Sequence, residues 1–306
     1  MDARELLKKI TGLNIFAEGL AEEMLSGNFR SLFKGQGVEF DEARHYQWGD
    51  DAKNIDWNAS ARLGATFVKL FKEERELTIL ILLDCSSSMR NCVSRPFGDE
   101  HYNDKHGALS LYEQAVICSA LIAFSAERSG LRIGSFLFDS EIHRVLPPRK
   151  GKSNVMAIIE GLLQKHESPS KSSRTSNISA AIAGAQRMLK RRSMIVIISD
   201  FLSIGWEKNF GSLCRGHDVI AVRVSDTKDN NISDLGLLLI KDPETGIQIH
   251  APTKHSSFKE AWSRQQNDRA KNWKNICQKA GAALLELQVD IDAAAALTRF
   301  FSRRSS

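Results

Sequence analysis

The order of apolar and polar residues predicts a sheet whose strands are buried on both faces. Residues 78–84 (TILILLD) and 194–200 (MIVIISD) are continuous apolar runs without alternation. This pattern is typical of parallel strands that are covered by helices on both sides. Further strands are predicted at 131–138, 141–148, 217–224 and 282–289, separated by helices at 109–130, 152–165, 178–191, 205–215, 257–280 and 291–304. This alternation predicts an α/β fold with a mostly parallel, helix-covered sheet.

An aspartate lies at the C-terminal end of each of the two most apolar predicted strands. Asp84 ends the first run and Asp200 ends the second. In open α/β sheets, ligands bind beyond the carboxyl ends of the strands. We therefore expect Asp84 and Asp200 to approach the same edge of the sheet.

The N-terminal quarter of the chain has a different pattern. Residues 1–75 show weak apolar periodicity and are rich in Gly, Arg and aromatic residues, which predicts a small irregular or β module packed on a main domain at 76–306. A turn sequence at 242–246 (DPETG) predicts a hairpin insertion near 236–252.

Composition narrows the class of protein. The chain has 306 residues, 42 % of them hydrophobic, which is enough for a buried core. Its 42 basic and 37 acidic residues leave a net charge of only +5, which argues against a nucleic-acid partner. Five scattered cysteines without a CxxC pair fit a reducing compartment. With neither an apolar signal region nor a membrane-length segment, the sequence predicts a cytoplasmic protein without a membrane span.

The candidate chemistry lies directly after the first apolar strand. Asp84, Ser86 and Ser88 form a D-x-S-x-S pattern, which can turn three hard oxygens toward one point and so suits Mg²⁺. The same residues could instead cap the next segment, and the spacing alone does not decide between the two. A hydroxyl at Ser176, which opens a predicted helix, and the carboxylate of Asp200 bring further oxygens to this edge.

Together these segments resemble the metal-ion-dependent adhesion site (MIDAS) of von Willebrand factor A-type domains. Nearly the whole chain, roughly residues 25–306, resembles a bacterial family of von Willebrand factor A-like domains of unknown function that is associated with MoxR-type AAA+ ATPases. The matching segments include SGNFRSLFKGQGVEF, RHYQWGDDAKNIDWNASAR, ELTILILLDCSSSM, VLPPRKGKSNV, RRSMIVIISDF and HDVIAVRVSD.

The resemblance implies a Rossmann-like fold and a Mg²⁺ or Mn²⁺ ion. The metal ligands it implies are Asp84, Ser86, Ser88, Ser176 and Asp200, with Thr175 as the alternative to Ser176 in the second loop. It also implies a binding module rather than an enzyme, in which an acidic side chain of a partner or client protein completes the coordination of the metal. The implied partner is a MoxR-type AAA+ ATPase, for which the protein would be an adaptor or cofactor in the assembly or maturation of a protein complex.

The main enzymatic alternative is a Mg²⁺-dependent phosphatase of the haloacid dehalogenase type. Those enzymes also place a nucleophilic aspartate after an apolar strand, and they need a second aspartate two residues later as the acid/base. Here that position is Ser86.

A second cluster of charged residues lies in the N-terminal module. It comprises Arg44, Asp50, Asp51 and Arg62. One interpretation is a docking surface for the ATPase. The other is a set of buried salt bridges that fix the irregular module to the sheet, and it is favoured by the neighbouring Tyr46 and Trp57, which are expected to be packing residues.

Overall fold

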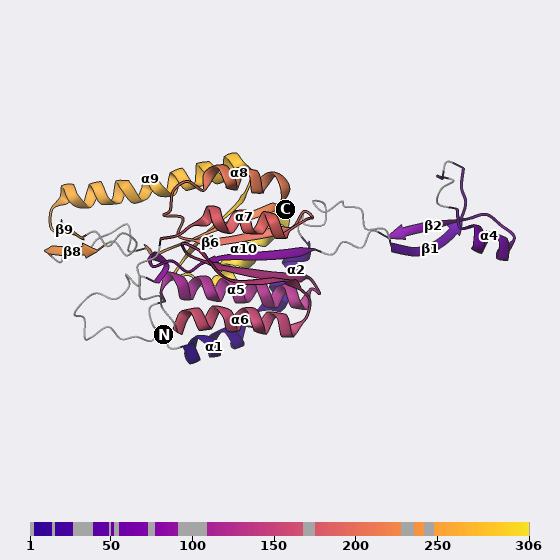
Figure 1. Cartoon of the computed structure of the whole chain (residues 1–306), viewed down its shortest axis with the longest axis horizontal. Helices are drawn as coiled ribbons and strands as arrows, with labels where there is room; N and C mark the ends of the chain where they lie inside the picture. The colour runs from indigo at the N-terminus through magenta and orange to yellow at the C-terminus, as the bar shows by residue number, and fades with distance from the viewer. Residues whose placement is uncertain are drawn as a thin grey trace. The chain divides into compact units, whose positions relative to one another are not determined.

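The computed structural model describes most of the chain as two compact units. The described residues are 3–13, 16–26, 39–48, 50–51, 55–72, 77–90, 109–167, 175–227, 236–241 and 248–305. One unit combines Met1–Asn28 with Leu77–Ser306, and the other is Phe29–Glu76 (Figure 1). This division differs from the predicted one, because the first 28 residues belong to the larger unit. The smaller unit ends at Glu76, next to the predicted boundary.

The larger unit is built on a central sheet. Six of its described strands form this sheet in the order β10-β7-β6-β3-β4-β5. Neighbouring strands are parallel except for the antiparallel pair β4–β5 at one edge. The strands are β3 (Thr78–Asp84), β4 (Arg132–Phe138), β5 (Ile142–Arg149), β6 (Met194–Ser199), β7 (Asp218–Ser225) and β10 (Ala283–Gln288). The predicted α/β class with a mostly parallel sheet is confirmed.

Helices cover both faces of the sheet, which explains the continuous apolar strands. Helices α7, α8 and α9 lie on one face, and α5 and α6 lie on the other (Figure 1). On the first face, Leu80 and Leu82 of β3 share a buried cluster with Ile182 of α7 and Phe210 of α8. The covering helices are α5 (Leu111–Arg128), α6 (Lys152–Glu167), α7 (Ile178–Met188), α8 (Glu207–Gly216), α9 (Ser256–Ala280) and α10 (Ala293–Ser305).

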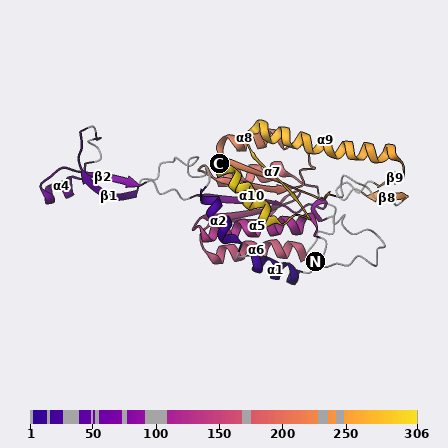
Figure 2. The ribbon, with the colours of Figure 1, turned by 180° about the vertical axis from the view of Figure 1, so that it is seen from behind.

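The N-terminal segment adds two helices to the larger unit, α1 (Ala3–Gly12) and α2 (Ala17–Ser26). Both lie near α5, and α2 also lies beside α10 (Figure 2). Leu20 and Met24 of α2 are buried, and the Ser125 hydroxyl of α5 donates to the carbonyl oxygen of Ala17 at 3.2 Å. Helix α5 is thus surrounded by other elements, which accounts for its nearly complete burial.

Among its described residues, the smaller unit has an antiparallel strand pair and one short helix. Strands β1 (Glu39–His45) and β2 (Phe67–Lys72) pair, and α4 (Trp57–Leu63) lies between them in the chain. The Asp56 side chain accepts from two backbone N–H groups at the start of α4, which caps the helix. None of the seven residues described in α4 is buried.

The larger unit also contains a hairpin. The predicted hairpin is present as the antiparallel pair β8 (Leu237–Lys241) and β9 (Gln248–Pro252). Among the described helices, none combines the length and apolarity needed to cross a lipid bilayer.

The close approach of β4 to β5 gives the first testable prediction. A Cβ atom on Gly134 would lie 2.6 Å from the carbonyl oxygen of Leu146 and 2.8 Å from the nitrogen of Pro148. Because both obstacles are backbone atoms, Gly134→Ala must push the edge strand β5 away. We expect it to lower the free energy of unfolding by about 1–3 kcal/mol, measured by urea denaturation.

The matched control is Gly211→Ala in α8. A Cβ atom there meets no atom within 4 Å. Replacing an interior helical glycine should therefore stabilise the protein by about 0.5–1 kcal/mol. A Gly134→Ala variant as stable as the wild type would contradict the tight β4–β5 contact.

Candidate metal site at the carboxyl edge of the sheet

The order of the strands creates a switch point between β3 and β6. The chain leaves β3 toward β4 on one side and leaves β6 toward β7 on the other, although β3 and β6 are neighbours. Connections that diverge in this way open a crevice beyond the carboxyl ends of the two strands, where α/β proteins bind ligands. Asp84 ends β3 and Asp200 follows β6, so both predicted carboxylates flank this point.

The structure brings the predicted site residues of three loops to this edge. Ser86 follows β3, Ser88 begins the 3₁₀ turn η3 (Ser88–Arg90), and Ser176 precedes α7. All five predicted metal ligands are buried, and none is more than 8 % exposed. Burial of so many polar groups at one point is costly unless each is satisfied by a partner or an ion.

Asp84 is the centre of the hydrogen-bond network. Its Oδ2 accepts from the hydroxyls of Ser176 at 2.6 Å and Ser199 at 2.7 Å, and its Oδ1 accepts from the Ser86 N–H at 2.9 Å. The Ser86 and Ser88 hydroxyl oxygens lie 3.1 Å apart. One carboxylate thus joins the loops after β3 and β6 to the start of α7. Of the two hydroxyls that the sequence left open, Ser176 contacts Asp84, whereas Thr175 is exposed.

Asp200 is held in place by an unusual backbone conformation. Phe201, the next residue, has φ = 54°, in the left-handed region that non-glycine residues rarely adopt. Its ring packs against Trp206 and Trp273, with centroids 5.2 and 5.8 Å away, and its N–H donates to the Ser199 hydroxyl. The Oδ1 of Asp200 accepts from the Leu202 N–H at 3.1 Å. Aromatic packing therefore maintains a strained turn that fixes the carboxylate at the edge.

Burial and a neighbouring carboxylate both act on the pKa of Asp84. Burial, followed by the negative charge of Asp200, raises the pKa of Asp84 from 3.8 to about 6, while hydrogen bonds from Ser176, Ser199 and Ser86 act in the opposite direction. A cation between these groups would remove the like-charge repulsion and offset the cost of burying the charges. The electrostatics of the site thus favour a positively charged ligand.

The set of donors fits a hard divalent cation. It consists of carboxylate and hydroxyl oxygens, which Mg²⁺ and Mn²⁺ prefer, and it contains few carboxylates, as is usual for Mg²⁺. The residues that could hold such an ion are Asp84, Ser86, Ser88, Ser176 and Asp200.

Two residues of this edge were not among the predicted ligands. Ser199 donates directly to Asp84, and the buried Asp139 follows β4. The backbone carbonyl of Asp139 accepts from the Asn177 N–H at 2.8 Å, which fastens the loop that carries Ser176. Their signal in the sequence is their position, because each lies at the end of a predicted apolar strand, as Asp84 does.

The predicted docking residues lie in the smaller unit. Arg44 Nη2 and Asp50 Oδ1 form an ion pair at 2.6 Å. The hydrogen bond from Arg44, with a second one from the Gln47 N–H, lowers the pKa of Asp50. Asp51 and Arg62 are exposed.

The aromatic residues of this unit correct one expectation. Tyr46 and Trp57, predicted to be packing residues, are 37 % and 71 % exposed, and Trp48 is completely exposed. The short helix α4 buries none of its residues, so it offers Trp57 no core in which to pack.

Curated relatives match either nearly the whole chain or about half of it. The "Uncharacterized protein Rv1480" of Mycobacterium tuberculosis (strain ATCC 25618 / H37Rv) is 27 % identical over 308 residues, covering 99 % of this chain and 91 % of the relative. An uncharacterised protein of Mycobacterium avium is 29 % identical over 164 residues, covering 52 % of this chain and 93 % of the relative.

Solved structures with a similar arrangement are more distant. The conserved hypothetical protein BatB from Bacteroides thetaiotaomicron is 17 % identical with a TM-score of 0.44, covering 74 % of this chain and 98 % of that one. A von Willebrand factor type A structure from Catenulispora acidiphila is 14 % identical with a TM-score of 0.34, covering 64 % of this chain and 43 % of that one. Because both TM-scores are below 0.5, the fold rests on the strand order and not on these likenesses.

The family is shown by a direct match. The model of the family described as "Protein of unknown function DUF58" matches residues 42–272, which is more than half of the chain. The chain therefore belongs to the DUF58 family.

Proposed function

We propose that this protein is a protein-binding module whose binding depends on a divalent metal ion, Mg²⁺ or Mn²⁺, and that it is not an enzyme. The observation that carries the proposal is the buried cluster around Asp84, in which two carboxylates and several hydroxyls converge at the switch point of the sheet. The resemblance to metal-ion-dependent adhesion sites supports the same interpretation.

The residues of the cluster have distinct roles in this proposal. Asp84, Ser86, Ser88 and Ser176 hold the ion, and Asp200 contributes charge directly or through water. When bound, the ion supplies a Lewis-acidic position for one more oxygen, because Mg²⁺ with few protein carboxylates keeps sites for other ligands. An acidic side chain of a partner protein is the ligand that this chemistry favours.

Helix α7 supports the approach of an acidic group. Ser176 and Asn177 directly precede its first turn, and the Asn177 side chain accepts from the Ala180 N–H as an N-cap. The positive end of a helix dipole favours anions at this position. A partner carboxylate would therefore meet both the ion and the helix terminus.

The phosphatase alternative requires an acid/base residue two positions after Asp84, and the chain has no carboxylic acid there. An acid/base two positions after Asp84 would have to be Ser86, whose hydroxyl lies 3.1 Å from that of Ser88. A serine hydroxyl in a buried hydrogen-bonded pair cannot replace a carboxylic acid as a proton donor at neutral pH. This chemistry favours binding over phosphoryl transfer.

The proposed partner is a MoxR-type AAA+ ATPase, or a client protein delivered to it, with this protein as an adaptor in the assembly or maturation of a complex. The ATPase itself comes from the family resemblance. The smaller unit supports a docking role, since Trp48 and Trp57 are exposed and the Arg44–Asp50 ion pair lies in the same unit. Exposed aromatic and arginine side chains are enriched among residues that dominate protein interfaces.

Metal binding gives a direct prediction for stability. Because an ion that binds only the folded state stabilises it, millimolar Mg²⁺ should raise the Tm of chelator-treated protein. Asp84→Ala should abolish this increase. The matched control is Asp290→Ala, which removes an exposed carboxylate that follows β10 at the same edge of the sheet, and it should keep the full increase.

A second variant keeps the test valid if Asp84→Ala does not fold. Asp200→Asn retains the size of the side chain and should reduce the Mg²⁺-dependent increase in Tm. It should also leave the chelator-treated protein at least as stable as the wild type, because it removes the repulsion of Asp84. Equal Mg²⁺ stabilisation in the wild type and both site variants would rule out the metal assignment.

Partner binding gives a separate prediction. A MoxR-type ATPase from the same organism should be retained by the immobilised protein in Mg²⁺ and released by chelator, and Asp84→Ala should abolish retention. Trp57→Ala should weaken it, whereas Met156→Ala, which removes a side chain 45 % exposed on α6 of the larger unit, should not. Retention that is indifferent to chelator and to Asp84→Ala would refute a metal-bridged contact.

A further inference from the structure

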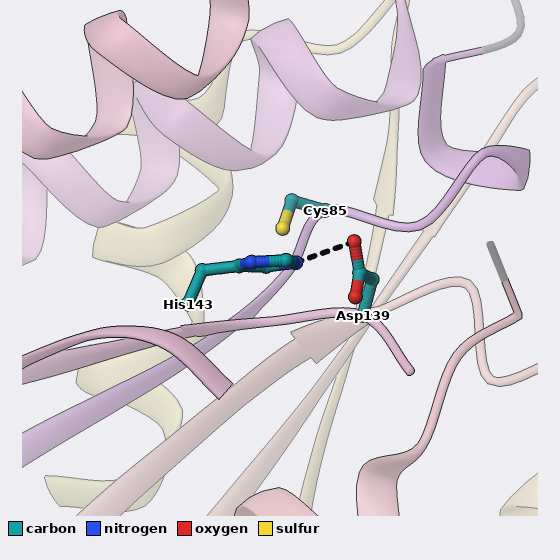
Figure 3. A group of neighbouring side chains, drawn as sticks. All are labelled: Cys85, Asp139 and His143. Carbon is teal, nitrogen blue, oxygen red and sulfur yellow. Dashed lines mark ion pairs between the residues drawn. The ribbon is translucent and has the colours of Figure 1, made fainter. Parts of the chain in front are cut away.

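A second group of potential metal ligands lies beside the Asp84 site. Cys85, Asp139 and His143 each offer one ligand atom, and these atoms all lie within 4.8 Å of one another. Figure 3 shows the three side chains pointing toward one another from different segments. Cys85 follows β3, Asp139 follows β4, and His143 belongs to β5. The group therefore joins three consecutive strands of the sheet.

A register shift in the edge strand directs His143 toward this group. Leu137 pairs with Arg144, but the next residue, Phe138, pairs with Ile142, so His143 is an extra residue without an opposite partner in the ladder. Such bulges redirect side chains and are over-represented next to functional sites.

The contacts of the flanking residues agree with this bulge. The Ile142 side chain lies against Gly184 of α7, so close that a Cβ atom on that glycine would touch it. The Arg144 side chain lies in the same way against Gly161 of α6. In a regular strand, residues 142 and 144 would point to the same face, yet α7 and α6 cover opposite faces of the sheet. The shift therefore lies at His143.

Asp139 supplies a buried carboxylate to the group. It is 1 % exposed, and its Oδ2 lies 2.5 Å from Nε2 of His143. Its Oδ1 accepts from the Glu141 N–H at 3.2 Å and the Ser140 hydroxyl at 3.3 Å, which fixes the carboxylate in the β4–β5 turn. The imidazole is 21 % exposed, so solvent reaches the group from the histidine side.

Cys85 supplies a thiol to the group from the loop after β3. Its Sγ lies 3.1 Å from the carbonyl oxygen of Phe138, to which it donates, and its N–H donates to the same oxygen at 2.8 Å. A nucleophilic Cys–His–Asp triad would need a thiol that a substrate can reach. Cys85 is only 3 % exposed, which disfavours that use.

The combination of sulfur, nitrogen and oxygen donors differs in kind from the all-oxygen Asp84 site. Thiolate and imidazole ligands favour borderline transition-metal ions. Three protein ligands that leave the fourth coordination position open are typical of catalytic zinc sites. We propose that Cys85, Asp139 and His143 form a second metal site, which takes Zn²⁺ or a similar transition-metal ion.

Metal binding would require a small local rearrangement. Adjacent nitrogen and oxygen ligands of tetrahedral Zn²⁺ stand roughly 3.3 Å apart, given bond lengths of about 2.0–2.1 Å. The Asp139–His143 pair is closer than this, at 2.5 Å, so the ion must replace their direct contact. His143 lies on the edge strand, where its partly exposed ring has room to move.

A metal ion bound to Cys85, Asp139 and His143 would also restrain the segments that position the Asp84 cluster. Cys85 lies between Asp84 and Ser86 in the chain, and the Asp139 carbonyl holds Asn177 beside Ser176. A metal ion joining Cys85 to Asp139 would therefore tether the loop that carries Ser86 and Ser88 to the turn that holds Asn177 beside Ser176. The second site does not depend on Mg²⁺ binding at the first.

Cobalt provides a spectroscopic test on the full-length protein. We expect chelator-treated protein that is then given millimolar Mg²⁺ for the Asp84 site to develop a thiolate-to-metal charge-transfer band in the near ultraviolet on titration with Co²⁺, and Zn²⁺ to remove this band. Cys85→Ser should abolish the band. His143→Gln and Asp139→Asn should weaken Co²⁺ binding at least tenfold.

Matched variants distinguish this site from the other thiols and from the Asp84 site. Cys214→Ser, Cys92→Ser and His217→Gln should leave the band and the affinity unchanged, and folded Asp84→Ala should also retain the band. If Cys85→Ser does not fold, His143→Gln at the more exposed position decides the matter. The proposal is overturned if the band is absent, if Cys92→Ser removes it, if folded Asp84→Ala removes it, or if His143→Gln binds Co²⁺ as the wild type does.

Discussion

The burial of two carboxylates at one edge of the sheet is the constraint on which this part of the molecule depends. Asp84 ends β3 and Asp200 directly follows the neighbouring parallel strand β6, so the topology brings their negative charges together in a buried site. The surrounding residues stabilise this arrangement: two serine hydroxyls and one amide donate to Asp84, and aromatic packing maintains the left-handed Phe201 beside Asp200. The remaining charge repulsion is the physical reason to propose a cation.

Strong local patterns predicted the sheet and its edge, while features that depend on tertiary packing were not predictable. The apolar run before Asp84 identified β3 because a strand buried on both faces has no polar positions. The pattern at the N-terminus did not reveal that α2 lies against α5 and α10 with Leu20 and Met24 buried, since an amphipathic helix does not specify the surface that it covers. The D-x-S-x-S spacing indicated the Asp84 site, but the bulge at His143 has no local signal and emerges only from the register of β4 and β5.

The two groups of donors at this edge have different donor atoms and therefore suit different metal ions. Around Asp84 the donors are oxygens, whereas one residue away Cys85 faces an imidazole and a carboxylate. Because hard and borderline ions prefer different donors, the two sites need not compete for one metal. The shared loop after β3 links them, whereas the docking role that we propose for the smaller unit rests on its exposed aromatic residues.

Anomalous diffraction from crystals grown with Mn²⁺ tests the central claim most directly, because it locates the ion without relying on stability or on a partner. The account predicts an anomalous difference peak within coordination distance of the Asp84 carboxylate and of the Ser86, Ser88 and Ser176 hydroxyls. It also predicts that the Ser176–Asp84 hydrogen bond of 2.6 Å is replaced or lengthened by the ion. A well-ordered edge with this hydrogen bond intact and no peak beside Asp84 would contradict the account.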